Sequence, residues 1–559
     1  MRKNLLKKAM SGILAGTMLA SMCAIPSAAA EVAYDGEIET VTLYPANANL
    51  QSGVVGGFRA DILAKYGVEL DVWAYSDEKT NAILASNTLP DVMYVTVDNL
   101  EVMIESGMIL NLEGYLDQLT NVTDKEVLQP ALNYVRESRS NGTGELDGIP
   151  TTVGNKVLEY GVTKNMTAVN WEYYSGIGCP PIKDQWELID VMKQMMEAYP
   201  EGEDGVANFG TYLNAGSDTQ FWANMQQYFK WFGYETTNLA YLLETNMVDA
   251  TCTSILEDNS KYYEGLKWYN QVYLEGLMDP DSINSDRATQ KAKVDNKHAM
   301  VPTGTVQGYS GYQPIFLEDQ KLYQESWNSP YGSDYLLVVS SECDNVEAAL
   351  RFINMLADPD AYLEFMSGPE GDLWYVEDGI AYMTEEAIET FKKGETWTLE
   401  NGEELALWNT AWVITDTLLS SYMGPDGEYR GVRIDRWDES LEITYNIESM
   451  NEWRELTGYE FFVYQAIDND AYTVDSELDY IANFTSVPDD MMQLTLDAIK
   501  DIVVNASWQM VYSQTEDEFN AIWDQMVQDC IDLGAQDIID WRLADIEQAK
   551  EKRDALSAE

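Results

Sequence analysis

An alternation of short apolar runs and helical patterns between residues 41 and 95 constrains the fold of this chain most. Residues 41–45 and 92–95 are short apolar runs typical of strands, and residues 68–74 alternate apolar with acidic side chains. Apolar residues at helical spacing follow the first run, and residues 79–86 have a second helical pattern. Because strands that alternate with helices favour a parallel sheet covered by helices, the chain predicts an α/β fold.

Longer helical patterns follow. Apolar residues recur at helical spacing within 186–196, 221–232, 262–273 and 346–356, and residues 335–340 return to a strand pattern. The last stretch predicts three helices at 491–503, 516–533 and 536–552. No repeat of 20 to 50 residues is present, which excludes a solenoid. We therefore expect an α/β fold with a helix-rich C-terminal extension.

The first thirty residues have the organisation of a secretion signal. Four basic residues within the first eight precede an apolar run from 13 to 25, and Ala28 and Ala30 are small residues that a signal peptidase accepts. We expect residues 1–30 to be a signal peptide and the mature protein to be secreted or associated with the cell surface. The alternatives are a membrane anchor, for which the apolar run is short, and lipidation at Cys23, for which the preceding Met22 is a poor fit.

The charge of the chain restricts its partners. Asp and Glu number 95 against 34 Lys and Arg, which gives a formal net charge of −61. Such a surface repels phosphate backbones and anionic lipids, so we expect no nucleic-acid partner. The acidic residues are spread along the chain, which is typical of a solvated surface. Cys179, Cys252, Cys343 and Cys530 form no CxxC pair, and we expect isolated thiols.

The single histidine, His298, excludes several classes of enzyme. Zinc sites of the HExxH type and facial triads need more than one histidine. The GYSGY segment at 308–312 lacks the last glycine of a nucleophile elbow, and no phosphate-binding loop is present. The acidic segment at 279–286 lacks the central glycine of an EF-hand loop, which leaves a structural calcium open. We expect no catalytic residues, no cofactor and no catalytic metal, and a structural role for His298.

Nine segments, taken in order, carry a resemblance to a known family. They include EKTNAILASNTLPDVMYV at 78–95, ELDGIPT at 145–151, YLEGLMDPDSINSD at 273–286 and GPEGDLWYVEDG at 368–379. These segments resemble the extracellular solute-binding proteins, family 1, of ABC sugar importers in Gram-positive bacteria, over nearly the whole chain after the signal. The chain departs from that pattern at Asn87, where the turn usually has glycine, and in lacking a well-placed lipoprotein cysteine.

The resemblance implies a two-lobe fold of the periplasmic-binding-protein type II with ligand held between the lobes. It places residues 31–152 and 297–343 in lobe 1, and residues 153–296 and 344–559, with the C-terminal helices, in lobe 2. The implied function is capture of a carbohydrate, an oligosaccharide, and its delivery to the membrane permease of an ABC transporter. The implied protein is a monomer with no chemistry of its own.

Loop residues with aromatic faces or polar side chains are the candidates for ligand binding, since a sugar presents C–H faces and hydroxyl groups. The candidates are Asn47, Tyr75, Asp91, Asp218, Trp222, Trp327, Tyr331, Trp374 and Trp408. Each aromatic residue has core packing as its alternative role, and Asp91 has a capping role. Three other functions stay open: a secreted glycoside hydrolase with two carboxylates about 5–9 Å apart, a binder of peptides or other solutes on the same fold, and a structural surface protein.

Overall fold

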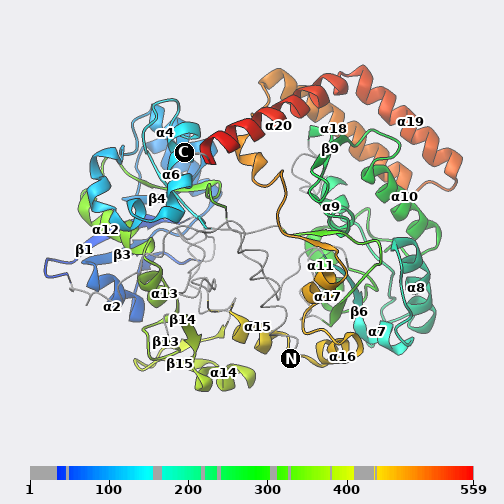
Figure 1. Ribbon diagram of the computed structural model, residues 1–559, viewed down its shortest axis with the longest axis horizontal. Coiled ribbons are helices and arrows are strands. Elements are labelled where there is room, and N and C mark those ends of the chain that lie inside the picture. The colour runs from blue at the N-terminus through cyan, green and yellow to red at the C-terminus, as the bar shows by residue number, and fades with distance from the viewer. Residues whose placement is uncertain are drawn as a thin grey trace.

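The computed structural model gathers most of its buried apolar side chains in two large hydrophobic cores, beside a small third cluster that includes Phe209 and Ala299. The described residues are 34–45, 50–154, 166–215, 221–235, 241–302, 311–324, 329–377, 380–407, 434 and 437–557. One core draws on residues 41–153 and 336–437, and we call this part the first half. The other draws on residues 166–331 and 441–556, together with Tyr134, and we call this part the second half. Figure 1 shows the two halves as separate bodies with the C-terminal helix reaching from one to the other.

The first half is built on a six-stranded sheet of order β2–β3–β1–β4–β12–β5. The strands are β1 (Glu39–Tyr44), β2 (Gly53–Val54), β3 (Val68–Val72), β4 (Val92–Thr96), β5 (Ile149–Pro150) and β12 (Tyr335–Val339). β1 is parallel to β3 and β4, whereas β12 is antiparallel to β4 and β5. The register sets Val41 beside Leu70 and Leu43 beside Val92, and all four side chains are fully buried. The parallel sheet predicted from residues 41–95 is confirmed.

Helices cover this sheet. They are α2 (Gly57–Lys65), α3 (Asp77–Ser86), α4 (Val97–Glu105), η1 (Glu113–Gln118), α5 (Thr120–Thr123), η2 (Glu126–Leu128), α6 (Gln129–Ser138), α12 (Val346–Leu356) and α13 (Pro359–Ser367). α12 packs its apolar face on β1, β3 and β12. Asn87 ends α3 with φ 53°, in the left-handed conformation that Asn adopts more readily than most residues. The helix therefore ends there although the turn has no glycine.

The chain stays in the first half after β12. Two hairpins and one helix follow α13: β13 (Trp374–Glu377), β14 (Ile380–Met383), α14 (Glu385–Lys392), β15 (Trp397–Thr398) and β16 (Glu404–Leu405). α15 (Asp438–Thr444) comes where the chain passes to the second half, since it packs against α14 while its Leu441 belongs to the second core. Buried residues from 348 to 437 join the core beneath the six-stranded sheet. The cores thus group the chain differently from the predicted division, which assigned 344–559 to lobe 2. The difference arises because α12 follows the sheet strand β12 directly and packs back on the same sheet.

The second half is mainly helical, with three small sheets. Its elements are β6 (Thr167–Asn170), α7 (Trp171–Gly176), α8 (Gln185–Ala198), α9 (Phe221–Trp231), β7 (Tyr234–Glu235), β8 (Leu243–Asn246), β9 (Thr251–Ser254), α10 (Lys261–Leu274), α11 (Arg287–Asp295), β10 (Tyr312–Ile315), β11 (Leu322–Tyr323), α16 (Glu448–Thr457), α17 (Phe462–Asp468), β17 (Tyr472–Thr473), η6 (Ile481–Phe484), α18 (Asp490–Val511), α19 (Glu516–Asp532) and α20 (Ala535–Ser557). α10 packs against α9 and α18, and α18 packs against α19. The predicted C-terminal helices are confirmed, although α18 is longer than its pattern predicted.

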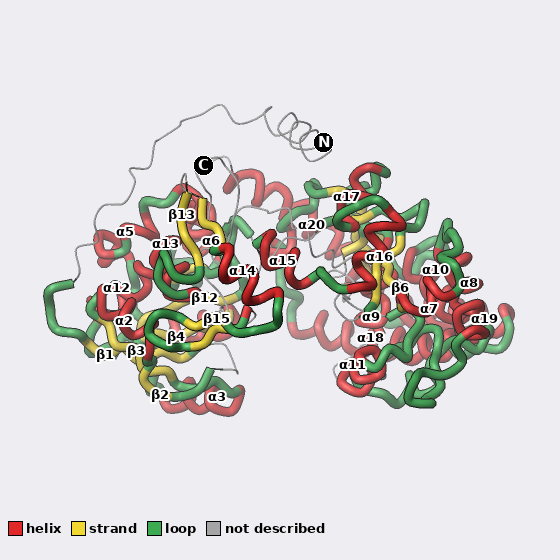
Figure 2. The backbone as a smooth tube through the Cα atoms, turned by 90° about the horizontal axis from the view of Figure 1, so that it is seen from below, coloured by secondary structure: helices red, strands yellow, loops and turns green. Residues whose placement is uncertain are grey.

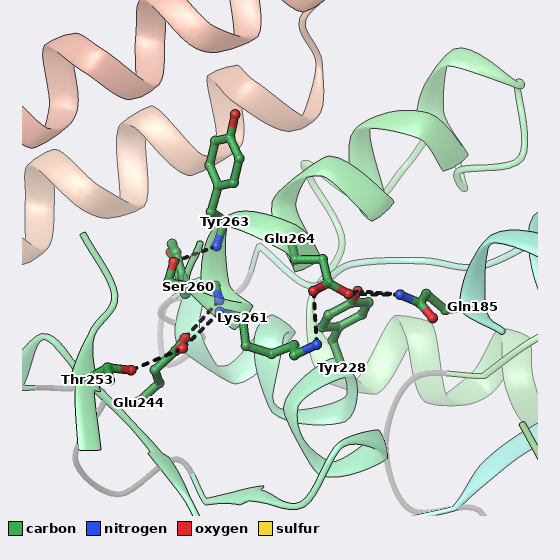
Figure 3. A network of polar contacts seen from close by, with 9 residues as sticks. Gln185, Tyr228, Glu244, Thr253, Ser260, Lys261, Tyr263 and Glu264 are labelled. Carbon is green, nitrogen blue, oxygen red and sulfur yellow. Dashed lines mark hydrogen bonds and ion pairs between the residues drawn. The ribbon is translucent and has the colours of Figure 1, made fainter. Parts of the chain in front are cut away.

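A buried polar network holds the start of α10 (Figure 3). Glu244 on β8 accepts hydrogen bonds from the backbone N–H groups of Lys261 and Tyr262 at 2.8 and 3.0 Å. Ser260 caps the same helix by accepting from the N–H of Tyr263 at 3.0 Å. These acceptors satisfy N–H groups that an isolated helix end leaves unpaired. Burial raises the pKa of Glu244 to about 7.

Glu264 extends this network into the aromatic core of the second half. Its Oε1 accepts from the Tyr228 hydroxyl and from the Gln185 amide, both at 2.8 Å. Its Oε2 forms an ion pair with Lys261 Nζ at 2.9 Å. Burial raises the pKa of Tyr228 well above its ordinary value, so its hydroxyl stays protonated and donates. The Glu264 carboxylate, the Tyr228 hydroxyl and the Lys261 ammonium group are thus paired with one another at the edge of this core.

The last helix, α20, connects the two halves. It contacts η6, α18 and α19 in the second half and α6 in the first, and its end lies beside the first half in Figure 1. Beneath this contact the Tyr134 ring packs against Phe484 with centroids 5.2 Å apart, and the Tyr134 hydroxyl donates to the Asn483 carbonyl. In Figure 2 the sheet of the first half and β6 of the second lie in different bodies, side by side.

No helix among the described residues combines the length and the hydrophobicity needed to cross a membrane. Cys179, Cys252, Cys343 and Cys530 are free thiols, and burial raises the pKa of each. The expectation of isolated thiols is confirmed.

Candidate functional site

Three parallel strands of the first half end at one edge of the six-stranded sheet. β1 ends at Tyr44, β3 at Val72 and β4 at Thr96. β12 begins at the same edge, because Tyr335 pairs with Thr96, and β5, which is antiparallel to β12, ends there. We call this edge, with the residues that directly follow β1, β3 and β4, the carboxyl edge. Ligands of α/β proteins gather at such edges, where loops leave the strands.

Three aromatic rings and a cation lie at the ends of β1 and β3. The backbone N–H of Trp73 donates to the Leu43 carbonyl at 2.8 Å, which holds Trp73 directly beyond β3. The rings of Tyr44 and Tyr75 have centroids 5.8 Å apart. Lys79 Nζ lies 5.2 Å from the Trp73 ring centroid and 5.7 Å from that of Tyr44. Trp73, Tyr75 and Lys79 are half-buried, so each keeps part of its surface in solvent.

Local hydrogen bonds fix the turn that carries these side chains. Ser76 begins α3, and its Oγ accepts from the Lys79 N–H at 3.2 Å. The Tyr44 hydroxyl donates to the Ser76 carbonyl at 2.9 Å. The Tyr75 hydroxyl donates to Asp77 Oδ1 at 2.5 Å, and this bond raises the pKa of Tyr75 to about 12. The rings at the carboxyl edge are therefore held by the cap of α3.

Two of the segments that link the halves, 150–154 and 329–335, run beside one another at this edge. Ser333 donates its N–H to the Thr151 carbonyl at 2.8 Å, and the hydroxyl oxygens of the two residues are 3.0 Å apart. Gly332 has φ +82°, and a Cβ there would lie 3.0 Å from the Pro150 Cβ and 3.1 Å from the Thr151 carbonyl oxygen. A residue with a side chain would force these segments apart, so glycine permits their close approach.

The carboxyl edge combines flat aromatic faces, hydroxyl groups and an ammonium group. This combination suits a ligand with an apolar face and a hydroxylated rim, because rings cover the face while polar groups bind the rim. Among the residues that the structure describes, no group of three or more histidine, cysteine, aspartate or glutamate side chains is arranged to hold a metal ion.

Of the predicted ligand residues, Tyr75 lies at the carboxyl edge. Asp91 precedes β4 rather than following it, and its Oδ2 accepts from Thr42 N and Oγ1 at 2.8 and 2.7 Å. The Asp91 side chain thus joins β4 to β1, a structural role that differs from the cap considered for it. A role of either residue in ligand binding stays a prediction.

Two predicted aromatic residues lie inside the cores. Tyr331 is 5% exposed and packs against Phe484 with ring centroids 4.8 Å apart. Trp374 is 2% exposed, and its indole N–H donates to the Gly368 carbonyl at 2.9 Å. Both rings pack against protein in this conformation. Trp222 lies on α9, and the remaining candidates lie outside the described residues: Asn47, Asp218, Trp327 and Trp408.

Sequence reasoning missed Trp73 and Lys79. A signal for Trp73 was present, because Glu69 and Asp71 mark the polar face of β3 and Trp73 continues that face beyond the strand end. A large aromatic residue on the polar face at a carboxyl end is a candidate for ligand contact. Lys79 had no such signal, since its place over two rings depends on how α3 folds back on the sheet.

The solved structures of several solute-binding proteins share this architecture. A structure described as an HMO-binding, ABC-transporter-associated solute-binding protein from Bifidobacterium longum infantis is 17% identical, covers 93% of this chain and 99% of its own, and has a TM-score of 0.56. The S. pneumoniae ABC-transporter substrate-binding protein FusA, in complex with kestose, is 15% identical, covers 93% of this chain and 100% of its own, and has a TM-score of 0.55. At these identities the likeness shows the fold, and the predicted two-lobe α/β fold is confirmed.

The sequence itself provides the family. A comparison with the curated proteins finds no significant match. A family model for the bacterial extracellular solute-binding proteins matches residues 59–373, which is more than half of the chain. The match includes the strands β3, β4 and β12 and the residues that follow β3 and β4 at the carboxyl edge, so the resemblance seen in the sequence is confirmed. The chain belongs to the bacterial extracellular solute-binding proteins.

Proposed function

We propose that this protein binds a carbohydrate, an oligosaccharide, outside the cell and delivers it unchanged to the permease of an ABC importer. The observation that carries the proposal is the carboxyl edge, where Trp73, Tyr75 and Lys79 are half-buried around the ends of two adjacent parallel strands. Membership of the solute-binding family supports it. The ligand contacts in this proposal are Trp73, Tyr75 and Lys79 from the first half.

Aromatic platforms supply the affinity in this proposal. Covering about 100 Å² of a sugar ring contributes about 2.5 kcal/mol. Two or three such contacts approach the roughly 8 kcal/mol of micromolar binding. The second half supplies the remaining contacts, for which Asp218 and Trp222 are the sequence candidates, and a ligand touching both halves favours the closed conformation. The secretion signal at 1–30 and a monomeric state belong to the same proposal.

A thermal-shift screen tests the proposal. The purified protein is heated with a panel of neutral mono- and oligosaccharides and of short peptides, since a bound ligand raises the melting temperature. We expect at least one oligosaccharide to raise it, and chromatography of the mixture to return that sugar intact. Hydrolysis of the sugar would assign the protein to the glycoside hydrolases, and a shift with peptides alone would contradict the carbohydrate ligand.

A pair of tryptophan variants locates the site. Trp73→Ala removes a half-exposed ring at the carboxyl edge, and we expect it to weaken oligosaccharide binding about tenfold, which corresponds to about 1.4 kcal/mol. Trp186→Ala is the matched control, because Trp186 is 41% exposed on α8 in the second half. Calorimetric titration of both variants measures the change. Equal affinity in the two variants would move the site away from this edge.

A further inference from the structure

The only histidine of the chain is buried between two oxygen atoms. His298 is 5% exposed. Its Nδ1 lies 3.1 Å from Asn208 Oδ1, and its Nε2 lies 3.2 Å from Asp204 Oδ2. Asn208 and Asp204 belong to the loop of residues 200–208 between α8 and the segment that pairs with Ala299. His298 therefore joins this loop to the chain that follows α11.

The orientation of the Asn208 amide determines which nitrogens of the His298 ring must carry a proton. The Asn208 amide nitrogen donates to the Tyr199 carbonyl at 3.0 Å, so its Oδ1 is the atom turned to the histidine. An amide oxygen only accepts, so Nδ1 of His298 must carry a proton. The carboxylate of Asp204 also only accepts, so Nε2 must carry a proton as well. A neutral imidazole has one N–H and would leave an acceptor facing an acceptor on one side.

We propose that His298 is an imidazolium in this conformation and acts as an acid-favoured latch for the loop 200–208. Loss of the Nε2 proton places a lone pair against the Asp204 carboxylate and releases the loop from that side. Histidine is the side chain whose unperturbed charge change falls nearest to neutral pH, which suits it to a pH-sensitive contact.

The charged groups around His298 leave one side of the ring that opens at low cost. The backbone N–H of His298 donates to the Lys293 carbonyl. The ammonium group of Lys293 is paired with Asp279 and Asp281 at 2.7 and 2.9 Å. The ammonium group of Lys297 is paired with Glu172 at 3.2 Å. Asp204 is the carboxylate within ion-pair distance of the ring among the described residues, and its side chain is 53% exposed, so it can move into solvent when the ring is neutral.

Hydrogen bonds within the loop 200–208 show whether the loop is held or released. Asp204 Oδ1 accepts from the Val206 N–H at 3.0 Å, and the Gly202 N–H donates to the Val206 carbonyl at 2.8 Å. Beyond the loop, Phe209 donates its N–H to the His298 carbonyl at 3.0 Å. Release of Asp204 exposes the amides of Gly202 and Val206 to exchange, whereas the Phe209 amide stays bonded to backbone.

Nuclear magnetic resonance and hydrogen exchange test the latch on the full, untagged protein. Because His298 is the single histidine, its ring nitrogen signals need no assignment. We expect both nitrogens to be protonated at pH 5.5, and exchange at Gly202 and Val206, corrected for intrinsic pH dependence, to become roughly tenfold faster by pH 8. The Phe209 amide should not change.

Two variants with the same change in charge separate the latch from general effects. Asp204→Asn offers a side chain that can donate to a neutral Nε2, so we expect loop protection to become independent of pH. Glu203→Gln alters the neighbouring exposed residue and should keep the pH dependence of the unmodified protein. A ring with one protonated nitrogen at pH 5.5, or loop protection that is flat from pH 5.5 to 8, would overturn the proposal. The same pH response in both variants would also overturn it.

Discussion

The two halves place their aromatic and polar side chains in opposite ways. In the first half the strands β1, β3 and β4 bury mainly aliphatic residues, and Trp73, Tyr75 and Lys79 stand at the sheet edge with part of their surface in solvent. In the second half large rings and hydrogen-bonded carboxylates lie inside the core, as Figure 3 shows for the start of α10. Aromatic content alone therefore does not mark a binding surface. At the carboxyl edge of the first half rings are available to a ligand, whereas the buried rings around α10 stabilise the fold.

Trp268 is the buried ring of the second half whose removal we expect to lower the free energy of unfolding most. It is 1% exposed, its ring lies 5.4 Å from that of Trp231, and its indole N–H donates to the Gln185 carbonyl at 2.7 Å. We expect Trp268→Ala to lower the free energy of unfolding by about 4 kcal/mol, through a cavity and a lost buried hydrogen bond. Urea denaturation followed by circular dichroism measures it. Trp186→Ala should change stability by less than about 0.5 kcal/mol, and similar losses in both would remove the contrast.

Glu244 tests the buried network through pH. Its pKa is raised from 4.5 to about 7 by burial, so the folded protein binds this proton more tightly than the unfolded chain does. The stabilising contribution is present below pH 4.5 and is lost as the pH rises through 7, a change of roughly 3 kcal/mol. We expect Glu244→Gln to flatten this part of the stability profile, measured by urea denaturation from pH 4.5 to 8.

Glu275 is a control, because its pKa is shifted in the opposite direction to that of Glu244. Its pKa is lowered by the hydrogen bond from Lys193, so its contribution is present above the ordinary pKa of glutamate and is lost as the pH falls. Glu275→Gln should therefore leave the decline between pH 5 and 8 in place. If the Glu244→Gln variant kept the full loss of stability between pH 4.5 and 8, another titrating group would cause that loss, and the network in Figure 3 would not.

A variant of Asp91 tests whether this predicted ligand residue has a structural role instead. Asp91→Ala leaves the Thr42 N–H and hydroxyl without their acceptor, and we expect a loss of about 2 kcal/mol in unfolding free energy. Calorimetric titration of the folded variant should give an unchanged affinity for the sugar identified in the thermal-shift screen. A marked loss of affinity with little loss of stability would instead place Asp91 in the binding site.

Tyr75 gives the smallest expected effect on stability. Tyr75→Phe keeps the ring and removes a hydroxyl whose partner, Asp77, is exposed. We expect the free energy of unfolding to change by less than about 0.5 kcal/mol, because exposed polar contacts contribute little. Denaturation curves of the variant and the unmodified protein provide the measurement. A loss above about 1.5 kcal/mol would show that the first half uses this edge for stability, as the second half uses its interior.

The sequence predicts the elements of this fold better than their assembly. The parallel strands around Val41 and the long C-terminal helices follow from local periodicity, which a short window contains. The assignment of the described residues between 344 and 437 to the first half depends on β12 pairing with β4, a contact between residues more than 200 apart in the chain. No local pattern contains that information.

The candidate site was harder to predict for a related reason. A tryptophan in a loop looks the same in sequence whether its ring meets solvent or protein, and Trp374 meets protein. Tyr75 was found because it closely follows a strand whose end could be read. Lys79 was missed because its contact with the Tyr44 ring forms only when α3 returns to the sheet.

The contact between α6 and α20 has a consequence for the order of events during synthesis. Its two partners begin at Gln129 and Ala535, so about 400 residues separate them along the chain. A ribosome adds roughly 5–20 residues each second, and domains form as they emerge. The sheet of the first half can assemble while later codons are still being read, but the contact between α6 and α20 forms only after about 400 further residues have been added.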